Sequence, residues 1–341
     1  MRQYNILSGT YICRGLAAWI AAALLMFIHP DIKAASYSEK SMLAEGNWVK
    51  VNVTTRGLQT LSRQTLRNFG FSDPAKVYVY GYGGRMISET LSSDHPDDLP
   101  PVPVMRGSDG SISFYATDNM TLRASTTKGG MEFDHVINPY SEDSYYFISD
   151  RTPSTEAEAI DLSDTAGMKA ATTAQHLLVH EKDLMQCATS GRDYLGEDFR
   201  STKAQTFNFD LADNAADNVK IRVRFGANAT AESSFMVSAN GERLPATSSD
   251  KISRVTSSSQ YYCVATSLKN ASVAGNSLAV GIEYSQAGVV STARLDWIEV
   301  EYTRQLSMRD SQLLFHVNPT APTAYSISGV GSDAIVWDVT R

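Results

Sequence analysis

The chain has 341 residues, of which 30 are Lys or Arg and 37 are Asp or Glu, giving a formal net charge of -7 at pH 7. This acidic balance gives no electrostatic reason to expect binding to the phosphates of nucleic acid, so we expect no nucleic-acid partner. The length favours two domains.

Residues 1–34 have the composition of a secretory signal peptide. Arg2 and Arg14 flank a polar start, and residues 15–28 form an uncharged apolar run that is shorter than the about 20 residues needed to span a bilayer. Ala34 supplies the small residue that a signal peptidase requires. We therefore expect export, with a retained N-terminal anchor as the alternative.

Residues 40–150 are expected to form a small β-rich domain with one short helix. Val49, Val51 and Val53 alternate with polar residues, as in a half-buried strand. Helical spacing of the large apolar residues over 58–69 predicts the helix, and Gly70 is placed to end it with a positive φ. Further strands are expected at 76–80, 112–116 and 145–149, and residues 94–101 read as an acidic loop.

Residues 151–175 change to Ala, Thr, Ser, Glu and Asp, and a linker or extended segment is predicted over 151–190. Residues 191–305 contain several short alternating strands, such as 219–225, and the hairpin dipeptide Asn240-Gly241. This pattern is typical of an antiparallel, jelly-roll-like β-sandwich, so the chain is expected to be mainly β. Residues 306–341 are expected to begin a following domain that is missing here, because the strand pattern over 334–341 ends without closing a sheet.

Two cysteines, Cys187 and Cys263, follow the expected signal peptide. Export permits a disulfide between them, but spacing alone neither supports nor excludes one. Cys263 lies in an expected strand and is interpreted as a core residue. Neither cysteine has a nearby oxyanion pocket in the sequence, so we do not assign a nucleophile to either.

Several motifs have a structural and a functional interpretation. Residues 81–85 (GYGGR) lack the Lys-Ser/Thr of a phosphate loop and predict a strand-end turn that needs positive φ. His176 and His180 would share one face of a helix, but their spacing from Glu181 differs from that of metalloproteases, so a plain β or loop segment is favoured over a metal site.

Charged and aromatic residues of the expected sandwich leave further alternatives. The alternating row Lys220, Arg222 and Arg224 is interpreted as a solvated strand face, with a ligand-binding stripe as the alternative. Arg192 and Glu197 are hypothesised to form an ion pair at a strand entry. The aromatic residues Tyr261, Tyr284 and Trp297 are expected to pack in the core, with stacking on sugars as the alternative.

Segments at 46–51, 70–81, 83–84, 114–116, 190–199, 295–300 and 336–340, taken in this order, resemble the N-terminal region of the PorU-type sortases of the type IX secretion system. These proteins are relatives of the gingipain cysteine peptidases, family C25. The likeness spans residues 46–341, and its most specific part is the Gly-Arg-rich stretch at 190–199.

The resemblance implies a non-catalytic region that precedes a caspase-like peptidase domain. The parent enzyme would cleave the C-terminal signal of secreted cargo and attach the cargo to surface lipopolysaccharide. No residue of this chain matches the family's catalytic positions, so we expect no catalytic, cofactor-binding or metal residue here, no cofactor, and leave enzymatic activity of the chain itself open.

The partners implied by the resemblance are the missing C-terminal peptidase domain, an outer-membrane secretion-system protein and secreted cargo. The implied location is the cell surface or outer membrane, with the periplasm as the fallback. The main alternative is a free-standing exported β-sandwich module that binds glycan or a surface protein. A third interpretation is a prodomain-like inhibitor of a peptidase.

Overall fold

A computed structural model of the chain describes residues 38–89, 97–126, 130–153, 167–168, 170–187, 193–257, 261–286, 291–332 and 334–339. The expected signal peptide and the first three residues of the expected acidic loop, 94–96, lie outside these residues. The described part is mainly β, as the sequence predicts, and α2 (Arg63–Asn68) is its one α-helix. No described helix has the length and apolarity needed to cross a membrane.

The chain forms two compact units, residues 1–44 with 87–98 and residues 45–86 with 99–341. In the described part of the first unit, the 3-10 turn η1 (Met42–Ala44) follows Ser38, and the Asp97 carboxylate accepts hydrogen bonds from the Ser38 backbone and hydroxyl. The second unit contains every described strand.

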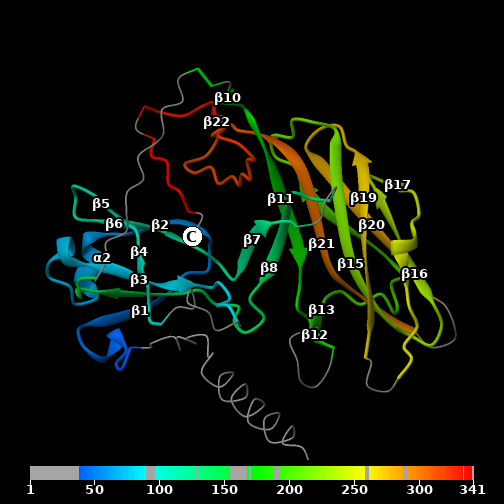
Figure 1. Ribbon diagram of the computed structural model, residues 1–341, viewed down its shortest axis with the longest axis horizontal. Coiled ribbons are helices and arrows are strands. Elements are labelled where there is room, and N and C mark those ends of the chain that lie inside the picture. Colours follow the sequence, from blue (N-terminus) through cyan, green and yellow to red (C-terminus); the bar gives the residue numbers. More distant parts are fainter. Residues whose placement is uncertain are drawn as a thin grey trace, which may run out of the picture. The chain divides into compact units, whose positions relative to one another are not determined.

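The N-terminal part of the second unit has three antiparallel groups of strands, of which the first two share one apolar core (Figure 1). Their orders are β1-β9-β3-β4, β2-β6-β5 and the hairpin β7-β8. Leu66, Val79, Ile112, Phe114 and Ile148 are buried in this core. The bounds are β1 (Trp48–Asn52), β2 (Gly57–Leu61), η2 (Pro74–Lys76), β3 (Tyr78–Gly83), β4 (Pro101–Val102), β5 (Val104–Arg106), β6 (Ile112–Ala116), β7 (Met120–Ala124), β8 (Phe133–Ile137) and β9 (Tyr145–Ser149).

The helix predicted over 58–69 is shorter than its apolar spacing suggests. Leu58 and Leu61 belong to β2, whose backbone pairs with β6, so the first half of that prediction is wrong. The helix begins after Ser62, whose Oγ accepts a hydrogen bond from the Thr65 backbone, and this cap fixes its start. Gly70 follows the helix with φ +97°, as expected.

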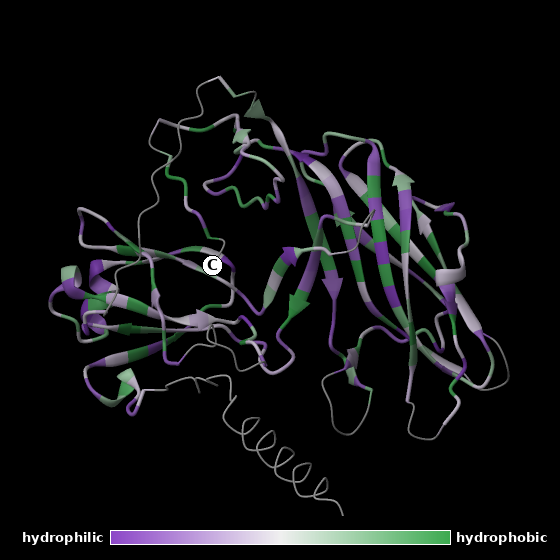
Figure 2. Ribbon diagram, viewed as in Figure 1, coloured by the Kyte–Doolittle hydropathy of each residue, from purple (hydrophilic) through white to green (hydrophobic). Residues whose placement is uncertain are grey.

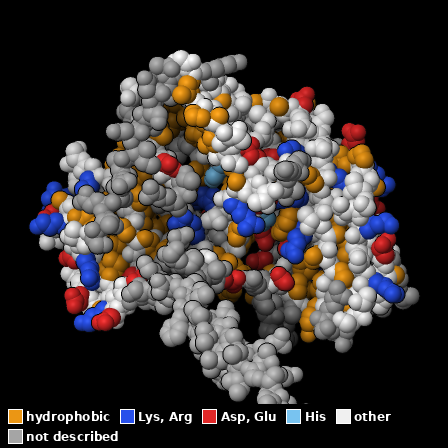
Figure 3. Space-filling view, viewed as in Figure 1, with side chains coloured by type: hydrophobic (Ala, Val, Ile, Leu, Met, Phe, Trp, Pro, Cys, Tyr) orange, Lys and Arg blue, Asp and Glu red, His pale blue; other side chains and the backbone are white. Residues whose placement is uncertain are grey.

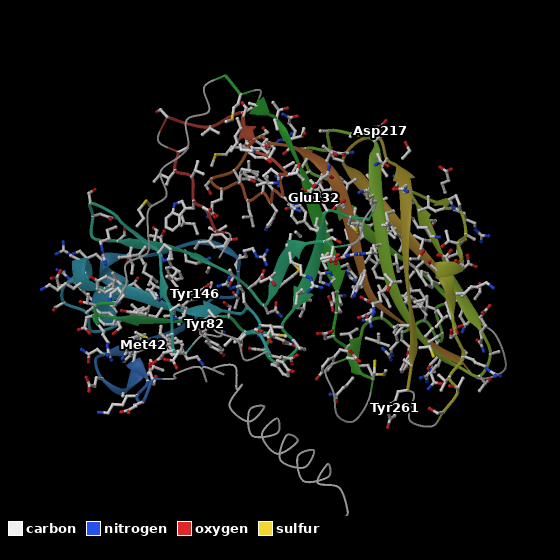
Figure 4. The ribbon with its side chains drawn as sticks, viewed as in Figure 1. Met42, Tyr82, Glu132, Tyr146, Asp217 and Tyr261 are labelled. Atoms are coloured by element: carbon white, nitrogen blue, oxygen red, sulfur yellow. The ribbon has the colours of Figure 1, made fainter. Side chains whose placement is uncertain are left out.

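The glycines at 81–84 lie within and just after β3 rather than in a turn beyond its end, so that detail of the prediction is corrected. Gly81 and Gly83 have positive φ, as predicted. The register between β3 and β9 shifts between Tyr80 and Gly83, which marks a β-bulge. The bulge brings the β3 backbone close to the Tyr146 side chain of β9, and Figure 4 labels this residue together with Tyr82 of β3.

The C-terminal part of the second unit is a jelly roll. Its eight principal strands pair antiparallel in two sheets, β11-β21-β15-β19 and β14-β20-β16-β17, with β18 beside β16 (Figure 1). Numbered from β11 to β21 without β12, β13 and β18, these orders are 1-8-3-6 and 2-7-4-5, the two sheets of a jelly roll. The bounds are β11 (Thr173–Glu181), β14 (Ala204–Asp210), β15 (Asn218–Ala229), β16 (Ser233–Ala239), β17 (Glu242–Arg243), η3 (Ser248–Asp250), β18 (Lys251–Ile252), β19 (Cys263–Ser272), β20 (Ser277–Ser285) and β21 (Ser291–Gln305).

The sandwich core follows from the period-two alternation of its strands. Val219, Ile221, Val223 and Phe225 of β15 are fully buried, and the residues between them point to the other face of the sheet. Figure 2 shows the resulting bands of hydrophobic and hydrophilic residues along the long strands. The expected strand alternation is confirmed. Asn240 and Gly241 both have positive φ, as a tight hairpin turn requires.

The expected linker, 151–190, contains the nine-residue strand β11, so the sandwich begins earlier than the sequence suggested. The strand lacks a clear alternation of apolar and polar residues, because it is a sheet edge whose two faces are both only partly buried. Two-stranded pairings complete the unit: β12 (Met185–Gln186) with β13 (Tyr194–Leu195), and β10 (Ala170–Ala171) with β22 (Ala324–Tyr325). The exact domain boundaries stay a prediction.

The expectation that residues 306–341 begin a further domain stays a prediction, but residues 306–328 fold back onto the strands already described. β22 pairs in parallel with β10, and the Gln312 side chain bonds to the backbone of Leu58 in β2. Residues 334–339 form no strand, contrary to the pattern read from the sequence, and Ile335 and Val336 are exposed.

Candidate functional site: a charged interface under a β-hairpin

The hairpin β7-β8 packs against the outer face of the sheet β11-β21-β15-β19. Met131, Phe133 and Leu177 are buried together in this contact, and Leu122, Val179 and Leu268 pack around them. Leu177 lies on β11 and Leu268 on β19, so the apolar part of the contact reaches strands at both edges of the sheet. The side chains of the sheet's outer face are therefore partly removed from water.

Lys220 and Arg222 are not part of a solvated strand face, so that interpretation is wrong. Arg222 donates to the Glu299 carboxylate through Nε (2.5 Å) and to the Asp134 carboxylate of the hairpin (2.6 Å). Lys220 Nζ lies 3.2 Å from Glu301 and donates to the Gly130 carbonyl (2.7 Å). Each cation therefore links its own sheet to the hairpin region.

His135 of β8 is held between two carboxylates of the sheet. Its Nδ1 lies 2.6 Å from Glu299 Oε1 and its Nε2 lies 2.5 Å from Glu181 Oε2, and only 5% of its side chain is exposed. Burial acts to lower the pKa of His135, but the hydrogen bonds to Glu181 and Glu299 outweigh it and raise the pKa to about 9. The imidazole is therefore protonated at neutral pH.

The carboxylates of β21 are also bound by backbone groups of the hairpin. Glu301 Oε2 accepts hydrogen bonds from the backbone nitrogens of Glu132 (2.5 Å) and Phe133 (3.2 Å). Glu299 Oε1 accepts one from the His135 backbone (3.1 Å). Two buried acids thus fix the position of the hairpin backbone against the sheet.

Arg224 and Asp296 lie at the end of the row of charged residues under the hairpin, and they pair with each other. Burial raises the pKa of Asp296 to about 7, since the attraction of Arg224 does not offset the loss of water and the nearby Glu181 adds repulsion. Trp297 lies beside them, with its ring against His135 (5.3 Å between centroids) and under the Arg222 guanidinium (5.5 Å).

The two histidines considered as a metal pair lie on strand β11, as the β interpretation expected, with side chains on the same face. His180 Nε2 is 2.9 Å from Glu197 Oε1, and the His176 ring packs edge-on against Tyr302. Glu197 also lies 3.4 Å from Lys182. The hypothesised partner of Glu197, Arg192, lies outside the described residues.

The two cysteines are free thiols in different surroundings. Cys263 is buried in the sandwich core, as predicted. Cys187 is half-buried, and burial, followed by the nearby Asp193, raises its pKa to about 11. A thiol with that pKa is protonated at neutral pH and is a poor nucleophile.

The three aromatic residues considered for stacking on sugars lie in three different environments. Tyr284 is buried in the sandwich core, and Trp297 is engaged by His135 and Arg222. Tyr261 is exposed, on the loop that leads into β19 at one end of the sandwich (Figure 4). They do not come together on one face.

The interface under the hairpin was missed by reading the sequence. One signal was present: Glu299 and Glu301 alternate with the apolar residues of β21 and stand opposite Arg222 and Lys220 in the sheet. A face with directly opposed charges on neighbouring strands can be covered without leaving a charge unpaired.

The arrangement is suited to holding two parts of the protein together rather than to covalent chemistry. Among the described residues, no group of three or more His, Cys, Asp and Glu is arranged to hold a metal ion. The expectation that the chain carries no catalytic, cofactor or metal residue stays a prediction. On the face drawn in Figure 3, acidic and basic side chains are both spread across the surface.

Comparison with solved structures places this architecture. The crystal structure of dimeric latent PorU from Porphyromonas gingivalis matches 80% of the chain with a TM-score of 0.67 and 30% sequence identity. The chain is a PorU-type region. It spans about a quarter of PorU, since the match covers 25% of that protein.

Two further solved structures match with lower TM-scores. A β-porphyranase of glycoside hydrolase family 86 from Bacteroides plebeius covers 75% of this PorU-type region and 34% of its own chain, with 9% identity and a TM-score of 0.25. An uncharacterised Listeria monocytogenes protein covers 74% and 18%, with 11% identity and the same TM-score. Such scores carry no functional argument. No family model and no curated protein sequence matches the chain.

Proposed function

We propose that this chain is the non-catalytic N-terminal portion of a type IX secretion sortase-like protein, in which it acts as a scaffold or docking region for the peptidase domain. The observation that carries the proposal is the PorU match, which combines 30% identity with a TM-score of 0.67 over 80% of the chain. The parent would cleave the C-terminal signal of secreted cargo and attach the cargo to surface lipopolysaccharide.

The charged interface supports the scaffold part of this proposal. A platform must keep its surfaces in fixed relation, and buried, directional ion pairs specify one arrangement more strictly than apolar contact does. His135, Arg222 and Glu299 supply such pairs between the hairpin and the jelly roll. In this role the residues are structural, and the chemistry belongs to another domain.

In the docking part of the proposal, the peptidase domain of the parent protein covers an apolar stretch at Ile335 and Val336. Ile335 and Val336 are 60% and 63% exposed, in a segment without hydrogen-bonded strand partners. PorU is about four times longer than the region matched here, so a PorU-type parent has further structure to cover this stretch. Burying two such side chains stabilises a contact by about 3 kcal/mol.

The partners and location proposed for this chain are those expected of the parent protein. An outer-membrane secretion-system protein and secreted cargo are the expected contacts, and export by the N-terminal segment would bring the chain to the cell surface. The proposed partners and location rest on the resemblance of this chain to the family. They are tested together in the producing organism.

The first test replaces Ile335 and Val336 together by Asp in the producing organism. We expect surface-attached cargo to fall at least about tenfold, because charged residues cannot be buried in the contact with the peptidase domain. Cargo would be followed in whole cells and in the medium by immunoblotting, alongside the amount of the chain itself.

The matched control is Leu184→Asp, since Leu184 is 62% exposed and lies away from the stretch in sequence. It should leave cargo attachment unchanged. Equal loss in both variants would contradict the docking site. Normal cargo processing after deletion of the whole coding sequence would contradict the sortase proposal, and glycan or surface-protein binding by the purified chain would then favour the free-standing module.

A further inference from the structure

Residues 306–328, called the strap here, run back from β21 along the N-terminal strands. The strap begins where the Leu306 backbone donates to the Thr172 carbonyl, and it ends where Ser328 returns to Leu306. Between these points, Gln312 accepts a hydrogen bond from the Leu58 backbone nitrogen (2.9 Å) and covers the open edge of β2. The pairing of β22 with β10 and the ion pair of Arg309 with Asp213 add further contacts to this segment.

Two imidazoles lie along this contact, and both are short of a partner. His316 of the strap packs edge-on against Phe133, with 5.9 Å between ring centroids. His176 of β11 packs against Tyr302 at 5.6 Å. The Nδ1 atom of each ring is buried and has no hydrogen-bond partner. Each imidazole therefore packs against an aromatic ring in an environment that favours its neutral form.

The groups that face these rings are mostly cationic. His176 interacts with Arg304 and His316, and His316 interacts with Arg56. Burial, reinforced by Arg304, lowers the pKa of His176 to about 4, and burial followed by Arg56 lowers the pKa of His316. A proton added to either ring would meet desolvation and like charge.

The carboxylates in this region are already engaged. Asp118 pairs with Arg56 at 2.6 Å, and Asp213 pairs with Arg304 and with Arg309 of the strap. Glu132 accepts a hydrogen bond from the Asn318 backbone, and burial followed by repulsion from Glu301 raises its pKa. Glu132, labelled in Figure 4, thus loses its charge early as the pH falls, which weakens rather than strengthens the strap.

We propose that the strap is an acid-released latch, held at neutral pH by the two buried neutral imidazoles and opened when they take up protons in water. Opening would uncover the edge of β2 that Gln312 now occupies. The hairpin interface responds differently, because His135 is already charged between Glu181 and Glu299. Mild acid should therefore release the strap while the hairpin stays docked.

The test is amide hydrogen exchange of the 341-residue chain at pH 7.5 and pH 5.0, corrected for the intrinsic exchange rate. Protection over residues 306–328 should fall by about tenfold or more at pH 5.0, because opening is coupled to proton uptake by groups whose unfolded pKa is near 6.5. Protection over the hairpin should be unchanged. Equal protection of the strap at both pH values would overturn the proposal.

Three variants separate the latch from general acid sensitivity. The double variant His176→Phe with His316→Phe keeps both aromatic contacts and should lose the pH effect, whereas His180→Gln should keep it because His180 has a carboxylate partner. If the double variant does not fold, His316→Gln should reduce the effect. An undiminished effect without His316 would overturn the proposal, as would ring titrations of His176 and His316 in the wild type at or above pH 6.5.

Discussion

Glu299 is the residue on which the hairpin interface depends most. Its side chain is 1% exposed and receives hydrogen bonds from Arg222, from the His135 backbone and, through Oε1, from the protonated His135 ring. Burial alone would raise the pKa of Glu299, but these partners lower it below its usual value. A single acid thus bonds to two cations that have little access to water, and each cation has a second carboxylate partner, Glu181 for His135 and Asp134 for Arg222.

Replacing Glu299 by Ala should be strongly destabilising. The change leaves Arg222 with only Asp134, and His135 with only Glu181, so buried positive charge loses compensation. Breaking a buried pair in this way costs about 3–5 kcal/mol. The measurement is the free energy of unfolding in urea, with binding of a hydrophobic dye as a check on the folded state.

Glu283→Ala is the control for that change. Glu283 also lies on a strand and pairs with an arginine, Arg243, at 3.0 Å, but 45% of its side chain is exposed. Such a surface pair contributes about 0–1 kcal/mol. Equal losses of stability in the two variants would show that the hairpin interface is not buried as described.

At the scale of elements, the bulge in β3 depends on a close approach that only glycine permits. Gly83 has φ +66°, and a Cβ there would clash with Thr117 and lie 2.5 Å from the Tyr146 hydroxyl. That hydroxyl accepts a hydrogen bond from the Thr117 backbone (2.8 Å), so it is not free to move away. The bulge therefore joins β3, β9 and the end of β6.

Gly83→Ala should lower the free energy of unfolding by about 2–4 kcal/mol, from the left-handed backbone and the overpacked contact together. Gly241→Ala is a suitable comparison, because Gly241 also has positive φ, +85°, but a Cβ there would meet no atom within 4 Å. It should cost only about 1–2 kcal/mol. Thermal unfolding followed by circular dichroism distinguishes the two, and similar losses would contradict the close approach.

At the scale of the whole second unit, stability should depend on the charge of His135. The pKa of His135 is about 9 in the folded protein and about 6.5 in an unfolded chain. The contribution is therefore complete below pH 6.5 and is lost as the pH rises through 9. The difference amounts to about 3 kcal/mol at most.

Urea unfolding of the wild type and of His135→Gln between pH 6 and pH 10 tests this dependence. The stability difference between the two proteins should be largest at pH 6 and should shrink toward pH 10. Leu184→Ala, an exposed and uncharged position, should give a difference that does not vary with pH. A constant difference for His135→Gln would show that the ring is not charged in the folded state.

Much of the fold could be predicted because strand periodicity is a local property. Alternation over 219–225 assigned a core face to β15, and positive φ at Gly70, Gly81 and Gly83 followed from residue type and position. The order of short motifs also pointed to the PorU family, which the structural match supports.

Only the tertiary structure decided what covers the opposite face of that strand. Arg222 looks the same in the sequence whether water or a carboxylate faces it, and its hairpin partner Asp134 is 88 residues away. The β11 strand and the returning strap were missed for the same reason, since their contacts are with distant segments rather than with their sequence neighbours. Local sequence sets which residues alternate, whereas the pairing of charges across a face depends on how the chain folds back on itself.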